Sequence, residues 1–388
     1  MPFFFKYHSD TLLPTDARHL HRGRRPCDIT GAAGNPCVAA HSTVRALYSK
    51  YNGGLYIVQK NQTQEQLTIG TLKPGGFADK AKHDTFCGPR KDCVILSVLD
   101  QSPMQNHLTQ RHGLVNASRH PITVGDNVGV YGMWFDPGFG YHVDDTRGIA
   151  TGNEPESIYA VMSGSRHTGA DAAHKGCCFD YGNSEDSRAA KNLSVGSGAM
   201  EAIYFGNTHW MQNAGDNTTV GPDGVMLDGP WVGADLEAGM YYGGGNRSKY
   251  NPQNKPLIQP FVSLYLRGGA DGFALKGGDA TKGKLQTMYD GPRPDCKVAT
   301  ITPPHPDAGA SICTRQRTNP YNVKRNITPS YQPMHKQGAI VLATGGDNSN
   351  SAIGNFYEGI MVTGVTTDAT DDLVQKNIVA VGYKNLPT

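Results

Sequence analysis

The chain has 388 residues, enough to bury a hydrophobic core without a metal ion or covalent cross-links. Its 36 Lys and Arg residues nearly balance its 34 Asp and Glu residues, and the charges are scattered, so the composition argues against a nucleic acid or an anionic membrane as partner. Glycine (48 residues), proline (24) and tyrosine (18) are frequent, which favours short strands and tight turns over long helices. We therefore predict a mainly β protein.

The first 25 residues lack a hydrophobic period and end in the basic stretch HRGRRP, which predicts a leader or a flexible arm. A secretory signal peptide needs roughly 7 to 15 consecutive apolar residues, and this segment offers only a patch of three phenylalanines, so no signal peptide is recognisable. No apolar run in the chain approaches the ~20 residues of a membrane span. Residues 26–388 contain no linker, and we predict one domain over this range.

Residues 37–51 (CVAAHSTVRALYSKY) place Val38, Val44, Leu47 and Tyr48 on one side of a helix, which predicts a short amphipathic helix. After it the pattern shortens to strand length, with Gly, Asn and Asp turns between the segments. Strands are predicted at residues 54–60, 66–72, 93–99, 122–135, 157–164, 177–182, 200–206, 231–242, 261–267, 272–278, 339–346 and 356–365.

Many short strands with almost no helix between them predict an all-β fold, a sandwich or jelly roll of stacked antiparallel sheets. Residues 292–333 are rich in Pro, Thr and Asn and predict a surface insertion. Gly278, Gly283 and Lys284 have the spacing of a phosphate-binding loop, but Leu285 stands where Ser or Thr would bind magnesium and no helix follows. We interpret this stretch as the turn of a hairpin.

The eight cysteines form four close pairs, and their even number and local spacing favour disulfides. The adjacent pair could also be two buried free thiols or form separate bonds to distant partners. The histidines do not have the spacing of zinc ligands, so we expect neither a metal ion nor another cofactor. The pairs are Cys27 with Cys37, Cys87 with Cys93, Cys177 with Cys178, and Cys296 with Cys313.

Six Asn-x-Ser/Thr sequons are compatible with an exported glycoprotein. Together with the paired cysteines they favour an oxidising compartment, and we expect a secreted protein. The sequons begin at Asn61, Asn116, Asn192, Asn217, Asn246 and Asn326.

Asp235 and Glu237 lie two residues apart in an apolar segment, so the strand period places both on one face. Two carboxylates on one face repel each other and lose hydration, which favours a functional site, although a solvated sheet face explains them equally well. A third acid, Asp347, follows the strand predicted at 339–346 in the stretch GGDNSN, which could also be a simple turn. If Glu237 and Asp347 meet across one cleft, they form the carboxylate pair of a glycosidase.

Three aromatic side chains, Trp210, Trp231 and Tyr242, could supply faces on which a sugar stacks. Packing in the core is the commoner role for such residues. The aromatic residues alone therefore do not establish a sugar-binding site.

A series of motifs from about residue 26 to 383 resembles, in order, the catalytic domain of the fungal α-L-arabinofuranosidase B family, glycoside hydrolase family 54. The resemblance implies a concanavalin-like β-sandwich and a retaining, exo-acting enzyme that removes terminal arabinofuranosyl side chains from plant cell-wall arabinoxylan or arabinan. The motifs are PCDITGAAGNPCVAAHSTVRALYSKYNGGLYIVQK, DTFCGPRKDC, LDQSPMQNHLTQ, CCFDYGN, MEAIYFGN, GPWVGADLE, GGADGFALKGG and GAIVLATGGDNSNSAIGNFYEGIMVTGV.

The resemblance also implies roles for individual residues. Glu237 matches the nucleophile and Asp347 the acid/base, while Ala238 replaces an Asn that usually follows the nucleophile, which affects specificity more than catalysis. The adjacent cysteines match a vicinal disulfide that lines the sugar pocket. The residues matched to sugar contacts are Asp235, Cys177, Cys178, Trp210 and Gly346.

Two other functions stay open. A non-catalytic carbohydrate-binding sandwich would keep the fold without turnover, and a glycosidase for another furanoside or pentoside, such as galactofuranose or xylose, would keep the chemistry. For all three functions we expect a monomer without nucleic-acid or membrane partners.

Overall fold

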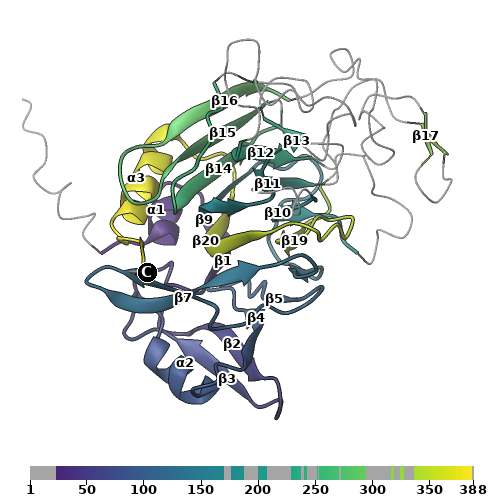
Figure 1. Ribbon diagram of the computed structural model, residues 1–388. Coiled ribbons are helices and arrows are strands. Elements are labelled where there is room, and N and C mark those ends of the chain that lie inside the picture. Colours follow the sequence, from purple (N-terminus) through teal and green to yellow (C-terminus); the bar gives the residue numbers. More distant parts are fainter. Residues whose placement is uncertain are drawn as a thin grey trace, which may run out of the picture.

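The computed structural model describes residues 23–169, 176–187, 200–207, 229–236, 240–242, 251, 253–270, 272–293, 316–318, 324–326 and 336–386. Two large antiparallel β-sheets make up most of this part of the chain and confirm the predicted all-β sandwich (Figure 1). Among the described residues, no helix has both the length and the apolar character needed to cross a membrane.

The first sheet has the strand order β16-β15-β14-β9-β20-β7-β6-β21, and β1 pairs with β20. Its strands are β1 (Cys37–Ser42), β6 (His120–Val124), β7 (Val128–Phe135), β9 (Glu156–His167), β14 (Val262–Gly268), β15 (Gly272–Asp279), β16 (Gln286–Pro292), β20 (Gly354–Thr363) and β21 (Lys384–Asn385).

The second sheet has the order β13-β12-β11-β10-β19-β8-β5-β4-β2-β3. A separate pair joins β17 (Gln316–Thr318) to β18 (Lys324–Asn326). The strands of the second sheet are β2 (Gly54–Lys60), β3 (Gln66–Gly70), β4 (Cys93–Val98), β5 (Leu108–Gln110), β8 (Tyr141–Val143), β10 (Asp180–Ser184), β11 (Glu201–Gly206), β12 (Trp231–Asp235), β13 (Met240–Tyr241) and β19 (Ala339–Leu342).

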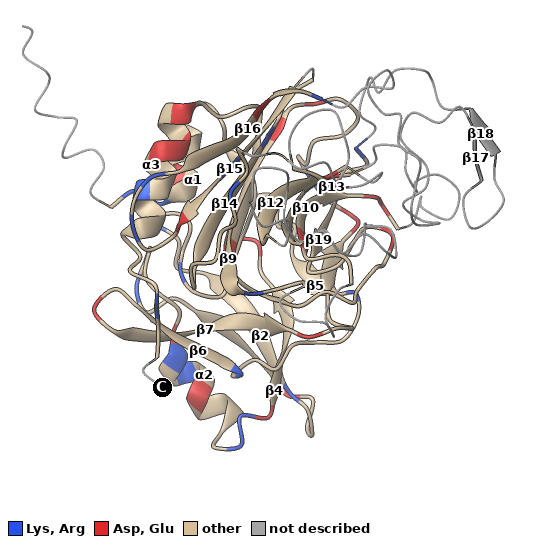
Figure 2. Cartoon of the chain, turned by 45° about the horizontal axis from the view of Figure 1, so that its top comes forward, with Lys and Arg blue, Asp and Glu red and all other residues tan. Residues whose placement is uncertain are grey.

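The described residues also form three helices, α1 (Pro26–Ala32), α2 (Lys80–Cys87) and α3 (Asp368–Val379). In Figure 1, α1 and α3 lie beside each other at one side of the molecule, and α2 lies at the other end beside β2 and β3. The side chain of Thr367 caps α3 by accepting a hydrogen bond from the backbone N–H of Thr370. Figure 2 shows both signs of charge dispersed over the fold, which agrees with the scattered charges of the sequence.

The core lies between the two sheets, where aromatic rings from both meet. The ring of Tyr181 on β10 lies 5.2 Å from that of Phe356 on β20, and Phe179 lies 5.6 Å from Phe135 on β7. Each ring is at most 1% exposed, and burial of such a side chain contributes roughly 1.5 to 3 kcal/mol. These contacts hold β10, and the residues just before it, against the first sheet.

The helix predicted at 37–51 is wrong. Residues Cys37–Ser42 form β1, which pairs with β20, and all six are buried. A strand covered on both faces shows no alternation, so its hydrophobic pattern can imitate that of a helix. The cross-strand pairing with β20 makes this segment a strand and not a helix.

The segments 122–135 and 231–242, each predicted as one strand, contain two antiparallel strands. Gly125 and Asn127 adopt positive φ angles of 51° and 63° in the turn between β6 and β7. The hairpin interpretation of Gly278–Leu285 is confirmed, because β15 and β16 pair antiparallel and Gly283 has φ +78° in the turn.

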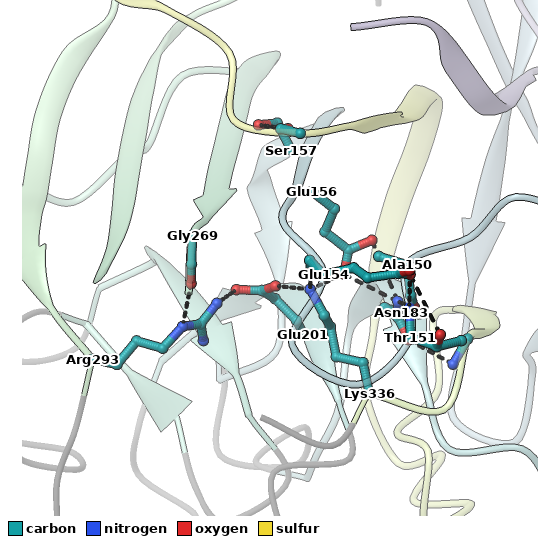
Figure 3. A network of polar contacts seen from close by, with 12 residues as sticks. Ala150, Thr151, Glu154, Glu156, Ser157, Asn183, Glu201, Gly269, Arg293 and Lys336 are labelled. Atoms are coloured by element: carbon teal, nitrogen blue, oxygen red, sulfur yellow. Dashed lines mark hydrogen bonds and ion pairs between the residues drawn. The ribbon is translucent and has the colours of Figure 1, made fainter. Parts of the chain in front are cut away.

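A buried ionic cluster, which we call the Glu201 cluster, joins strands of the two sheets (Figure 3). Glu201 on β11 binds Arg293 and, at 2.8 Å, the Nζ of Lys336. Lys336 lies 3.3 Å from Glu156 on β9, which accepts a hydrogen bond of 3.0 Å from Asn183 on β10. The cluster thus ties β9 of the first sheet to β10 and β11 of the second.

The two acids of this cluster titrate differently. Burial and the nearby charge of Glu201 raise the pKa of Glu156 to about 7, although Lys336 opposes the shift. Burial would also raise the pKa of Glu201, but Arg293 and Lys336 together outweigh it, and the pKa is lowered. Glu201 is therefore the charged partner of the two cations.

We expect Glu156→Gln to flatten the dependence of stability on pH. Between the ordinary pKa of 4.5 and about 7, folded Glu156 keeps a proton that the unfolded chain has released, so the free energy of unfolding falls as pH rises. Glutamine cannot titrate, and urea midpoints measured across this range should fall less steeply in the variant. Glu154→Gln, which removes an exposed acid two residues away, is the control and should keep the wild-type slope. Equal slopes for Glu156→Gln and wild type would contradict the assignment.

Candidate functional site

Cys177 and Cys178 lie at the entry to β10 and are joined to each other in the structure by a disulfide. Cys178 is 3% exposed and packs with three aromatic side chains, while Cys177 is half-buried against the same group. We call this group the Cys178 cluster. Its aromatic members are Tyr204, Trp231 and Tyr242.

The aromatic rings of the Cys178 cluster pack edge to face. The ring of Tyr242 lies 5.3 Å from that of Trp231 and 6.3 Å from that of Tyr204. Trp231 and Tyr242 are 6% and 3% exposed, so they pack against Cys178 and do not present open faces to a sugar. Trp231 and Tyr242 are therefore better described as core-packing residues than as faces on which a sugar stacks.

Two buried acids lie beside this cluster. Asp180 is the first residue of β10 and Asp235 is the last residue of β12, with β11 between the two strands. Ligand atoms of Cys178, Asp180 and Asp235 all lie within 4.8 Å of one another. Cys178 and Asp180 are two residues apart, which explains why both project from the same face.

These three residues form the group of potential metal ligands found among the described residues. The sulfur of Cys178 is bonded to that of Cys177, so it cannot act as a thiolate ligand. Two carboxylates remain among the residues that the structure describes, which is fewer than the ligand sets that proteins use for zinc or calcium. The chemistry of the group fits a hydrogen-bonding site better than a metal centre.

Asp180 has an unusual environment for a carboxyl group. It is fully buried, and neither of its side-chain oxygens has a hydrogen-bond donor. Burial, and then the charges of Asp235, Asp347 and Glu185, raise the pKa of Asp180 well above its ordinary value. A carboxyl group in this position is expected to keep its proton.

Asp347 lies in a tight turn after β19 and is exposed. Its Oδ1 accepts a hydrogen bond of 2.8 Å from the backbone N–H of Ser349, and the N–H of Gly345 donates to the carbonyl of Ser349 at 2.8 Å. Asn348 takes a φ of 74°, which Asn tolerates better than most residues. The turn therefore fixes the orientation of the Asp347 carboxylate.

This turn packs against the disulfide. A methyl group on Gly345 would lie 2.9 Å from Oδ1 of Asp347 and 3.6 Å from Sγ of Cys178. The carbonyl of Cys177 accepts a hydrogen bond of 3.1 Å from the backbone N–H of Ser351. Segments that are far apart in the sequence thus bring the exposed acid next to the cysteine pair.

Gly346 has no room for a side chain, because a Cβ there would collide with Oε2 of Glu185. Glu185 follows β10, is 3% exposed and accepts a hydrogen bond of 3.2 Å from the hydroxyl of Ser184. Glycine at position 346 therefore lets the backbone of the Asp347 turn approach the end of β10 closely.

The structure brings together five of the seven site residues expected from the sequence: Cys177, Cys178, Asp235, Gly346 and Asp347. Glu237 and Trp210 lie outside the described residues, as do Ala238 and the pair Cys296 and Cys313. In the segment predicted as one strand at 231–242, the structure describes β12 (Trp231–Asp235) and β13 (Met240–Tyr241). The predicted disulfides Cys27–Cys37 and Cys87–Cys93 are confirmed.

Sequence reasoning missed Asp180 and Tyr204. The signal for Asp180 was present in the stretch CCFD, because the strand period places it on the face of Cys178. No local signal identifies Tyr204, which joins the site because β10 and β11 pair with Asp180 opposite Tyr204.

Comparison with known proteins gives consistent matches over nearly the whole chain. The family model described as "Alpha-L-arabinofuranosidase B, catalytic" matches residues 26–303 and 308–384. The chain is 39% identical over 372 residues to Alpha-L-arabinofuranosidase B of Aspergillus niger, which covers 92% of this chain and 63% of the relative. The chain thus spans less than two thirds of the length of this relative.

Two solved structures match with a TM-score of 0.74 and cover 93% of this chain and 66% of theirs. One is a GH54 α-L-arabinofuranosidase soaked with a cyclic sulfate inhibitor, at 38% identity. The other is an arabinofuranosidase complexed with arabinofuranosyl-α-1,2-xylobiose, at 37% identity.

The pairing of Cys177 with Cys178 predicts a specific labelling pattern. Alkylation of the unfolded, unreduced protein should leave the peptide that contains both residues unlabelled, and reduction should add two labels to that single peptide. Mass spectrometry of a digest measures both states. The Cys87–Cys93 pair is the internal control, because trypsin can cut between its cysteines at Arg90 or Lys91 and the two peptides then stay linked until the disulfide is reduced. Label on Cys177 or Cys178 before reduction would contradict the pairing.

Proposed function

The chain belongs to the α-L-arabinofuranosidase B catalytic family, glycoside hydrolase family 54, and we propose that it is a retaining, exo-acting α-L-arabinofuranosidase. The observation that carries the proposal is the approach of three acids to one cysteine pair, with Asp180 and Asp235 buried and Asp347 exposed. Such an arrangement suits a pocket that encloses one terminal sugar and leaves the bond to be cleaved at its mouth.

The two catalytic roles fall to acids on different segments. Glu237 attacks the anomeric carbon and forms a covalent glycosyl intermediate, while Asp347 protonates the departing oxygen. Asp347 then takes a proton from the water that releases the sugar. A retaining pair requires carboxyl groups roughly 5 to 5.5 Å apart, a separation that a turn of fixed geometry at Asp347 helps to maintain.

The remaining site residues bind the sugar. The Cys177–Cys178 pair supplies an apolar, polarizable surface for one face of the furanose ring, and Asp235 accepts hydrogen bonds from its hydroxyl groups. Trp210 matches the family's sugar-facing tryptophan, and Gly346 matches a backbone contact beside the acid/base. These contacts are the ones that the family assignment supports.

The proposed substrates are terminal arabinofuranosyl side chains of arabinoxylan or arabinan. The matched structure in complex with arabinofuranosyl-α-1,2-xylobiose supports a side chain on a xylan backbone as one such substrate. Disulfides persist in oxidising compartments, so Cys27–Cys37 and Cys87–Cys93 support action outside the cell. We propose a secreted monomer.

We expect the protein to release L-arabinose from 4-nitrophenyl α-L-arabinofuranoside with retention of anomeric configuration, which nuclear magnetic resonance of the first product measures.

Asp347→Asn should lower kcat/KM about 10²- to 10⁴-fold on arabinofuranosyl-xylobiose, because the alcohol leaving group needs protonation. The loss should be smaller on the nitrophenyl substrate, whose leaving group needs little protonation. Glu237→Gln should abolish turnover of both.

Several outcomes would change the proposal. Inversion of configuration, or equal losses in Asp347→Asn on the two substrates, would contradict the assigned roles. Binding of arabinose-containing oligosaccharides without released sugar would favour a non-catalytic sandwich. Release of galactose or xylose from the corresponding aryl glycosides would keep the chemistry and reassign the sugar.

A further inference from the structure

We propose that Asp180 is a positioning residue of this site: as a neutral carboxylic acid it donates a hydrogen bond to Asp235 and thereby orients the Asp235 carboxylate toward a sugar hydroxyl. The inference rests on the proposed function, because it assigns a partner to the sugar-binding acid of that site. In this proposal Asp180 acts through Asp235 and not on the reacting atoms.

Asp180 is fully buried, and no described residue supplies a donor to its carboxyl group. Neither oxygen of Asp180 receives an N–H or O–H bond, and a buried carboxylate without such bonds is very costly. Asp100 provides a contrast within the same chain. It is 4% exposed, and its oxygens accept bonds from the backbone N–H groups of Ala40, Ser102 and Asn106 and from the Ser102 hydroxyl.

Asp180 also lies close to a second buried acid, Asp235. The Asp180 and Asp235 oxygens lie within 4.8 Å of each other, and two ionised carboxylates cannot satisfy one another. When one carries a proton, an O–H···O⁻ hydrogen bond satisfies both groups and is among the stronger kinds in proteins. Asp180 is the more deeply buried acid, and Asp235 is 5% exposed, so the proton belongs on Asp180.

The groups that face Asp180 reinforce this assignment. Asp235 on β12, Asp347 after β19 and Glu185 after β10 each add negative charge, which disfavours ionisation of Asp180. The phenols of Tyr204 and Tyr242 also lie nearby, but Tyr204 donates its hydroxyl to the carbonyl of Asn207 at 2.7 Å. The hydroxyl of Tyr242 has no hydrogen-bond partner. Neither phenol therefore supplies a donor to Asp180.

Two substitutions at Asp180 should differ in their effect on activity. Asp180→Asn retains an N–H donor toward Asp235 and should keep kcat/KM within a few-fold of wild type, with an unchanged pH profile, because one neutral group replaces another. Asp180→Leu has a similar size but no donor and should lower kcat/KM about 10- to 100-fold, the loss expected for one hydrogen bond to a charged group.

A double-mutant cycle separates positioning from a merely structural role. If Asp180 acts through Asp235, then Asp180→Leu should cost nothing further in an Asp235→Ala background. A structural role would cost the same in both backgrounds. Thermal unfolding of each variant checks that it is folded, and Asp180→Asn keeps the test valid if the leucine variant does not fold.

A spectroscopic readout needs no catalytic activity. The infrared difference spectrum between wild type and Asp180→Asn at neutral pH should contain the band of a protonated carboxyl group. Wild-type protein that releases no arabinose would refute the proposed function, while this band would still decide the state of Asp180.

Three results would overturn the inference. The first is the absence of the protonated-carboxyl band. The second is an alkaline limb of kcat/KM that moves to lower pH in Asp180→Asn, because removal of a true negative charge would lower the pKa of the neighbouring acids. The third is activity that is lost in a chelator and restored by a divalent cation, which would assign Asp180 and Asp235 to a metal site.

Discussion

The antiparallel pairing of β10 with β11 on one side and β19 on the other is the constraint on which the site depends. β10 carries Asp180 two residues after Cys178, β19 leads into the Asp347 turn, and β11 connects to β12, which ends at Asp235. These strands come from positions 180 to 342 of the chain, so no local segment contains the site. A shift of one residue in the register of β10 would turn Asp180 into the core and Tyr181 toward the site, because successive side chains alternate between the two faces.

The buried acids on these strands lie in two opposite environments. At Glu201, directly opposite Asn183, two cations neutralise the charge and the acid stays ionised. Three residues earlier on β10, Asp180 has no donor and faces further acids. A paired buried acid holds β-strands together, and its loss leaves uncompensated cations, whereas an unpaired buried acid destabilises the fold unless it binds a proton or a ligand. The paired acid Glu201 thus belongs to the part of the sheet that maintains the fold, and the unpaired acid Asp180 belongs to the part that forms the site.

The sequence predicted much of this architecture from local pattern. Strands such as Gly54–Lys60 alternate or run apolar between turn residues, and they were predicted at their observed positions. β1 could not be recognised, because burial on both faces removes the alternation by which a half-buried strand is identified. The contact between Asp180 and Asp235 could not be read from local pattern either, since it depends on the register of two successive strand pairings. The Asp347 turn was visible in GGDNSN, but its position beside Cys178 follows only from the pairing of β19 with β10.

Under the proposed function, the buried and the exposed acids act on opposite sides of the scissile bond. The buried acid binds the sugar, and the exposed acid exchanges protons with the leaving group and with water. A sugar hydroxyl exchanges hydrogen bonds with water for hydrogen bonds with the protein on binding, so the acid that receives it gains from being buried and fixed. Asp235, 5% exposed and next to Asp180, meets that requirement. The leaving group must depart and water must enter, so the acid that exchanges protons with both has to lie where solvent reaches it, as Asp347 does. Terminal side chains of a polymer suit this arrangement, because only the sugar enters the buried part while the backbone stays outside.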